Sequence, residues 1–221
     1  MTTAYAPPLP GDGTPTARPR PGAPAPQPAL ATALLAPLGL LTLLNACTAL
    51  ALRPAIRQAL AGLTSGIDTM ERWMWIGALG SPLVGLATAA LVALCLWAAL
   101  VLTGADPAWR PLLVAATYGE IARAAEGAFI ALVLHLRGLA TLRTPADLRV
   151  PTGLDIALDL DSPAAFVLAQ HVGLFYLLWL AALAAGVRTA APVSWPRALA
   201  TAACPWLLGT AYALVQRGGA P

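Results

Sequence analysis

The stretch PLVGLATAALVALCLWAALVLT, residues 82–103, contains no charged side chain. About 20 apolar residues in a helix are enough to cross the hydrocarbon core of a bilayer, which is roughly 30 Å thick. Four other stretches have a comparable length and character, at residues 29–52, 111–136, 164–186 and 197–215. The sequence therefore predicts an all-α fold, a polytopic transmembrane helix bundle with five spans.

Composition supports a membrane protein over a soluble one. The chain has 221 residues, of which 58% are hydrophobic and 10% are charged, whereas about a quarter of the residues of a soluble domain are charged. The net charge of +3 is dispersed, without the basic stripe that nucleic-acid binding requires. Every basic residue other than histidine is arginine, a coding bias typical of a GC-rich bacterial genome, so we expect a multi-pass protein of the bacterial inner (cytoplasmic) membrane.

The chain divides into two regions. Residues 1–28 contain nine prolines among alanine, glycine and threonine, a composition that cannot form a packed core. We expect a disordered N-terminal tail over residues 1–28, followed by a five-helix transmembrane domain over residues 29–216.

Local signals predict where the helices begin and end. Arg53 is expected to end the first span, and Ser81 to cap a second helix whose first residue is Pro82. Gly186 is expected to end the fourth span. Between the first two spans, residues 53–77 place apolar residues at helical spacing beside charged ones, which favours an amphipathic helix on the membrane surface, with an ordinary ordered loop as the alternative.

Apart from Arg197 at the first position of the fifth, the only charges within the five apolar stretches lie together in the third, at Glu120, Arg123 and Glu126. An isolated charge at bilayer depth costs about 2.5–3.5 kcal/mol on insertion scales, and steps of three residues bring Arg123 within reach of both glutamates. One interpretation is a proton or ion pathway or a polar contact with a partner helix; the other, which we favour, is a structural ion-pair cluster that fixes helix register. Small residues on the same face would let another helix approach closely: Ala116, Gly119, Ala124 and Gly127.

Other polar residues in the spans are weaker candidates. Tyr118, His135 and His171 are possible accessory polar groups. Two separated histidines without an HExxH pattern do not indicate a metal site, and the acidic loop at residues 137–163 lacks regular calcium-ligand spacing. The sequence has no GxSxG, P-loop or dinucleotide-binding pattern. We therefore expect no enzymatic activity, no catalytic residue, no metal and no cofactor.

The order of these features resembles the Yip-one domain family of five-span membrane proteins, over residues 29–216. The segment GSPLVGLATAALVALCLWAALVLTGADPAWRPLLVAATY, residues 80–118, is similar to that family's paired second and third spans. The segment DSPAAFVLAQHVGLFYLLWLAALAAGV, residues 161–187, is similar to its span with Phe and Trp before a terminal glycine, although Phe175 and Trp179 are one residue farther apart than usual. The resemblance implies a small helical bundle; eukaryotic members are membrane factors of vesicle traffic that bind Rab-type GTPases, and bacterial members mostly lack an assigned activity.

These observations favour a non-enzymatic membrane scaffold or adaptor that organises partner proteins or lipid. Its expected partners are the lipid bilayer and either a membrane protein or a second copy of the chain, and not nucleic acid. The alternative is a small transporter, or a transporter subunit, in which the Glu120–Arg123–Glu126 cluster acts on a moving proton or ion.

Overall fold

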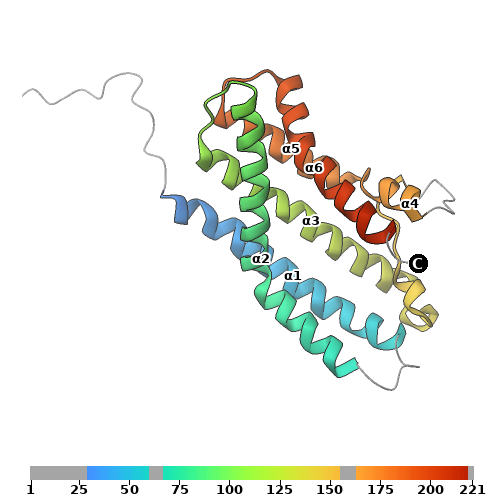
Figure 1. The fold of residues 1–221 in the computed structure, drawn as a ribbon. Helices are drawn as coiled ribbons and strands as arrows, with labels where there is room; N and C mark the ends of the chain where they lie inside the picture. The colour runs from blue at the N-terminus through green and yellow to red at the C-terminus, as the bar shows by residue number, and fades with distance from the viewer. Residues whose placement is uncertain (1–28, 60–66, 155–162, 219–221) are drawn as a thin grey trace, which may run out of the picture.

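The computed structural model describes residues 29–59, 67–154 and 163–218, and these parts of the chain are helical, without a β-strand. The tail expected over residues 1–28 lies outside these ranges, as do Asp155, Asp159 and Asp161 of the acidic loop. The elements shown in Figure 1 are α1 (Leu30–Ala59), α2 (Ile67–Leu102), α3 (Trp109–Arg137), the short 3₁₀ helices η1 (Leu139–Thr141) and η2 (Pro145–Leu148), α4 (Pro163–Gln170), α5 (Leu174–Ala190) and α6 (Trp195–Gly218). The helices expected over 111–136 and 197–215 are thus present as α3 and α6.

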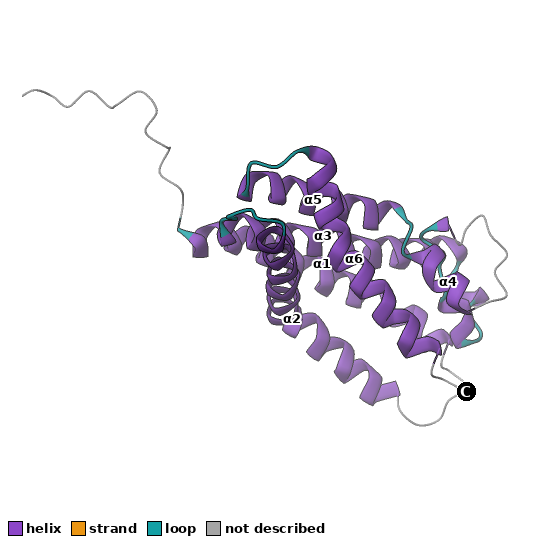
Figure 2. Ribbon diagram, turned by 45° about the horizontal axis from the view of Figure 1, so that its top comes forward, coloured by secondary structure: helices purple, strands orange, loops and turns teal. Residues whose placement is uncertain are grey.

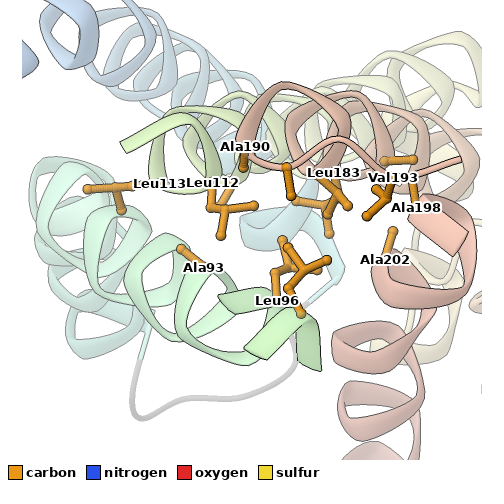
Figure 3. Close-up of a cluster of buried hydrophobic side chains, with 14 of the residues drawn as sticks. Ala93, Leu96, Leu112, Leu113, Leu183, Ala190, Val193, Ala198 and Ala202 are labelled. Atoms are coloured by element: carbon orange, nitrogen blue, oxygen red, sulfur yellow. The ribbon is translucent and has the colours of Figure 1, made fainter. Parts of the chain in front are cut away.

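Helix α3 lies at the centre of the bundle. It packs most extensively against α5 and α1 and also contacts α2, while α6 packs against α5, α2 and α4 (Figure 1). The main hydrophobic core lies between α2, α3, α5 and α6 and consists mostly of alanine and leucine side chains, among them Ala93, Leu96, Leu112, Leu183 and Ala198 (Figure 3). Because alanine is short, these helices approach one another closely along most of their contact.

Large apolar side chains also cover the outside of the bundle. Leu83 and Leu102 of α2 are 76% and 87% exposed, and Leu43 of α1 is 61% exposed. Within the described ranges, three helical segments are long and apolar enough to cross a membrane: α1, residues 72–102 of α2, and residues 195–216 of α6. Exposed apolar surface of this extent marks contact with lipid or a partner, so we conclude that the chain is a membrane protein.

Helix α2 does not begin at Pro82, as the capping signal predicted, but starts at Ile67 and continues through the proline. Pro82 has no N–H, so the carbonyl of Ala78, four residues earlier, loses its helical hydrogen-bond partner. The hydroxyl of Ser81 donates to that carbonyl at 2.8 Å and replaces the missing bond. Figure 2 shows that α2 changes direction along its length, as expected for a helix with an internal proline. The Ser-Pro pair therefore belongs to a bend and not to a helix start.

Arg53 does not end the first helix either. Helix α1 continues to Ala59 because Ala55 and Ala59 are buried in a second hydrophobic cluster, with Leu134 of α3 and two loop residues, Leu142 and Val150. Residues 53–59 thus belong to α1 and residues 67–77 to α2, so the separate surface helix predicted over 53–77 is wrong for the described residues. The stretch between them, residues 60–66, is outside the described part of the chain.

The fourth apolar stretch, expected as one helix over 164–186, is broken into α4 and α5. The break at residues 171–173 is stabilised by its neighbours: the N–H of Leu154 donates to the carbonyl of Val172 at 3.2 Å, and Trp206 Nε1 of α6 donates to the carbonyl of His171 at 3.0 Å. Gly153 and Gly173 form an isolated antiparallel bridge there. A Cβ on Gly173 would lie 2.7 Å from the Thr152 carbonyl oxygen, so the two backbones can meet only because this residue is glycine.

Gly186 lies inside α5 and does not end it, since the helix continues to Ala190. Its role is to allow close packing: a Cβ at this position would collide with the Cβ of Ala115 on α3. The sequence interpretation as a helix end was therefore wrong, and the glycine serves the central α3–α5 contact instead.

Replacing Gly186 by Ala should therefore destabilise the bundle. Overpacking against Ala115 costs about 1–3 kcal/mol, more than the gain in helix propensity of about 1 kcal/mol. Thermal unfolding in detergent, followed by circular dichroism, would measure the loss. Gly209→Ala is the matched control, because nothing lies within 4 Å of a Cβ at that helical position; it should unfold at or above the wild-type temperature. If Gly186→Ala were as stable as Gly209→Ala, the close α3–α5 contact would be disproved.

Candidate functional site

The charged cluster predicted from the sequence lies in the middle of α3. Arg123 is the central residue of this helix, about 21 Å from either end at 1.5 Å per residue. Glu120 is buried, with 8% of its surface exposed. It is buried because neighbouring helices approach α3 at its small residues: Gly119 lies against the indole ring of Trp179 on α5, and Gly127 lies against Thr48 on α1. The small face predicted to receive a partner helix is thus used, at these two positions, inside the bundle.

A cleft with a volume of about 410 Å³ opens beside this cluster. Residues of three helices, α1, α2 and α3, line it. The lining residues are Leu41 and Asn45 of α1; Gly77, Ser81, Val84, Gly85 and Thr88 of α2; and Glu120, Arg123, Ala124 and Glu126 of α3. More than half of these are polar, charged or glycine, which is unusual within apolar helices. We call this space the polar cleft.

The three charged residues do not form the mutual cluster that their spacing suggested. Arg123 Nη1 lies 3.7 Å from Glu120 Oε2, longer than the 2.7–2.9 Å of a hydrogen-bonded pair of this kind. Glu126 instead accepts a hydrogen bond of 2.6 Å from the hydroxyl of Thr152. Among the described residues, Arg123 forms an ion pair with Glu120 alone, so the prediction that it bridges both glutamates is wrong in geometry.

Three buried polar atoms near the cluster have no hydrogen-bond partner among the described residues: Glu120 Oε1, the indole nitrogen of Trp179 and the hydroxyl oxygen of Thr48. The Trp179 side chain lies near the Glu120 carboxyl group, but the two do not meet with hydrogen-bond geometry. A buried polar atom without a partner is costly and rare in folded proteins, so Glu120 is the residue of this cluster whose environment most requires an explanation.

The accessory residues predicted from the sequence do not line the polar cleft. Tyr118 is half exposed and lies in a separate groove between α3 and α5, near Arg110. His135 Nδ1 lies 2.9 Å from the carbonyl oxygen of Ala131, one turn earlier on α3. His171 is at the α4–α5 break, where its ring lies 4.8 Å from that of Tyr176.

No group of three or more His, Cys, Asp or Glu side chains that could hold a metal ion occurs among the described residues. In the acidic loop, Asp147 accepts hydrogen bonds from the backbone N–H groups of Arg143 and Thr144, at 2.9 and 2.7 Å, and from the Thr144 hydroxyl at 2.9 Å. These bonds hold the pKa of Asp147 below its usual value. Asp147 therefore stabilises a turn in this loop.

Sequence reasoning missed three residues of the site. Thr152 is 26 positions from Glu126 in the chain, and no local pattern connects them. Ser81 was interpreted as a helix cap, and Thr88 was hidden in a stretch interpreted only as an apolar span. The serine before Pro82 was a usable signal, because a hydroxyl beside an internal proline can replace the lost backbone bond.

Comparison of the chain with protein-family models, with curated proteins and with solved structures gives no match. The assignment of a function therefore depends on the chemistry of the polar cleft.

The structure predicts which of two substitutions in the site lowers the stability of the protein more. Thr152→Val removes a short hydrogen bond to a carboxylate from a buried residue, and bonds of that class contribute about 1.5–3 kcal/mol. Arg123→Ala removes a long contact of a half-exposed side chain, a class of ion pair that contributes about 0.2–1 kcal/mol in water. We expect Thr152→Val to lower the unfolding temperature in detergent more than Arg123→Ala does.

Thr152→Ser is the control, because it keeps the hydroxyl and should behave nearly as wild type. The reverse order, with Arg123→Ala the more damaging change, would restore the interpretation of a cluster centred on Arg123.

Proposed function

We propose that this chain is a multi-pass protein of a bacterial inner membrane and acts as a non-enzymatic scaffold that holds a membrane partner, protein or lipid, at the polar cleft. The proposed five crossings are α1, α2, α3, α5 with the short α4 before it, and α6. At 29 residues, α3 is about 43 Å long, enough to cross a core of about 30 Å despite its charges. The same helix order underlies the proposed relationship to the Yip-one domain family.

One observation carries the scaffold proposal. Arg123 has 46% of its side chain exposed on a helix whose neighbours present leucine to the outside. Lipid tails cannot satisfy a guanidinium group, and ionisable residues in membrane helices are retained where they meet a partner or a water-filled cavity. The polar cleft is therefore the surface at which a second molecule would satisfy groups that this chain leaves open.

Site-specific photo-cross-linking tests this proposal. A photoreactive benzoylphenylalanine in place of Val84, which lines the cleft and is 66% exposed, should give a discrete adduct with a membrane partner or a second copy of the chain. The same group in place of Leu208 on α6, which is 64% exposed and does not line the cleft, should not. The adduct at Val84 should weaken in an Arg123→Ala background. Identical adduct patterns at the two positions would reject the scaffold proposal.

A second candidate function is a small transporter or a subunit of one. It is favoured by the position of Glu120, a buried carboxyl group near the middle of α3, since substrate and coupling-ion sites of transporters lie near the bilayer midplane. In reconstituted vesicles, proton-coupled flux that Glu120→Gln abolishes and Asp106→Asn leaves intact would establish transport. Asp106 is an exposed carboxylate in the α2–α3 turn, outside the cleft. Absence of flux in the wild-type protein would eliminate this candidate.

A further inference from the structure

The chemistry of the polar cleft specifies what kind of group it can receive. Glu120 lines the cleft, is 8% exposed, and its Oε1 atom has no hydrogen-bond partner. Its other oxygen is 3.7 Å from Arg123, too far for a strong charge-assisted hydrogen bond. The carboxyl group of Glu120 therefore lines the cleft without a strong hydrogen bond to another described residue, although its Oε1 atom is itself fully buried beside Trp179.

Two residues of α2 with hydroxyl groups, Ser81 and Thr88, also line the cleft. Ser81 donates its proton to the carbonyl of Ala78 at 2.8 Å, and Thr88 donates to the carbonyl of Val84 at 2.9 Å. A hydroxyl has one proton and two lone pairs, so each oxygen retains accepting capacity and has no proton left to donate. Together with Glu120, these residues supply acceptors to the cleft, whereas Arg123 and Asn45 of the same lining supply donors.

The net charge of the cleft also favours a positively charged ligand. Glu120 and Glu126 face one arginine, Arg123, which gives a formal charge of −1 when both glutamates are ionised. A ligand with one positive charge would neutralise it. Charge neutralisation is worth more here than in water, because Coulomb interactions strengthen as the effective dielectric constant falls.

A bare metal ion fits these groups poorly. The two glutamates are six residues apart on one helix, an axial separation of about 9 Å, and Glu126 is already bonded to Thr152. One ion would therefore meet a single free carboxylate, whereas calcium takes six to eight oxygen ligands. The cleft volume of about 410 Å³ is instead within the range of small-molecule sites, roughly 300–1,000 Å³.

We infer that the polar cleft binds an organic ammonium group, with Glu120 as its counter-ion and the Ser81 and Thr88 hydroxyl oxygens as further acceptors. The half-exposed guanidinium of Arg123 is positioned to hold a phosphate or carboxylate attached to the same ligand. An ammonium supplies three donors and one positive charge, which match the acceptors and the formal charge of the cleft. The group can belong to a free amine or to a lipid headgroup, and the inference deepens the proposed function by naming the chemistry of the bound partner at the same cleft.

The test uses the full-length protein in nanodiscs of phosphatidylglycerol, a lipid without an amine. Ethanolamine and phosphoethanolamine are titrated against a sodium chloride control of equal ionic strength, and the unfolding temperature is measured, because a ligand that binds only the folded state raises it. The wild-type protein should show a saturable increase with both amines. Glu120→Gln should weaken binding at least tenfold, Thr88→Val should weaken it several-fold, and Asp106→Asn should bind as wild type.

Nanodiscs that contain phosphatidylethanolamine distinguish the two sources of the ammonium group. If the headgroup occupies the cleft, this lipid will compete with ethanolamine and raise its apparent dissociation constant; if the ligand is a free amine, the constant will not change. Either result supports an ammonium site.

The inference is overturned if neither amine gives a saturable effect in phosphatidylglycerol nanodiscs, or if Glu120→Gln and Thr88→Val bind ethanolamine as tightly as wild type. Its failure is separable from failure of the scaffold proposal. Amine binding without a discrete adduct at Val84 would reject the scaffold alone, and an adduct at Val84 without amine binding would reject the ammonium site alone.

Discussion

The close approach of α1 and α5 to α3 is the constraint on which the rest of the structure depends. It requires a glycine on one of the two helices at each of these contacts: α3 supplies Gly119 against Trp179 and Gly127 against Thr48, while α5 supplies Gly186 against Ala115. In lipid, where apolar surface gains nothing from leaving water, such packing is a principal source of helix association. The same approach buries Glu120, so the packing of the bundle and the unusual state of its carboxyl group have one cause.

Most of the serine and threonine hydroxyl groups described in this bundle donate hydrogen bonds to backbone carbonyls of their own helix. Threonine and serine hydroxyls on α1, α2, α3 and α6 donate to carbonyls three or four residues earlier, as Thr42, Thr117 and Thr210 do. Each such bond lets a polar residue lie in an apolar helix without an external partner. Glu120 has no equivalent arrangement for one of its oxygens, and Arg123 extends to the exposed side of the cleft. The buried atoms without a partner thus include Glu120 Oε1 and Trp179 Nε1 at the α3–α5 contact and Thr48 Oγ1 at the α1–α3 contact.

Much of the fold could be predicted from the sequence, because long apolar runs have few alternatives to helix. The helical class and the positions of α3 and α6 were predicted correctly. The errors arose where one residue type has two uses: Ser81-Pro82 can start a helix or sustain a bend within one, and Gly186 can end a helix or admit a neighbour. Only tertiary packing decides between them, as it does for α1 beyond Arg53. In the site, Glu120, Arg123 and Glu126 could be predicted because charge in lipid is costly. Their neighbours could not be predicted, because Thr152 and the residues of α2 come from distant segments of the sequence.

The contact between Thr152 and Glu126 also limits how the chain can vary in length. From Arg137 at the end of α3, the chain must return so that Leu142 and Val150 enter the cluster with Ala55, the Thr152 hydroxyl reaches Glu126, and Gly153 meets Gly173. A residue inserted or deleted between Gly138 and Thr152 would place these groups out of register together. Homologous chains that keep the glutamate should therefore show an ungapped alignment over this segment, even where its exposed side chains differ.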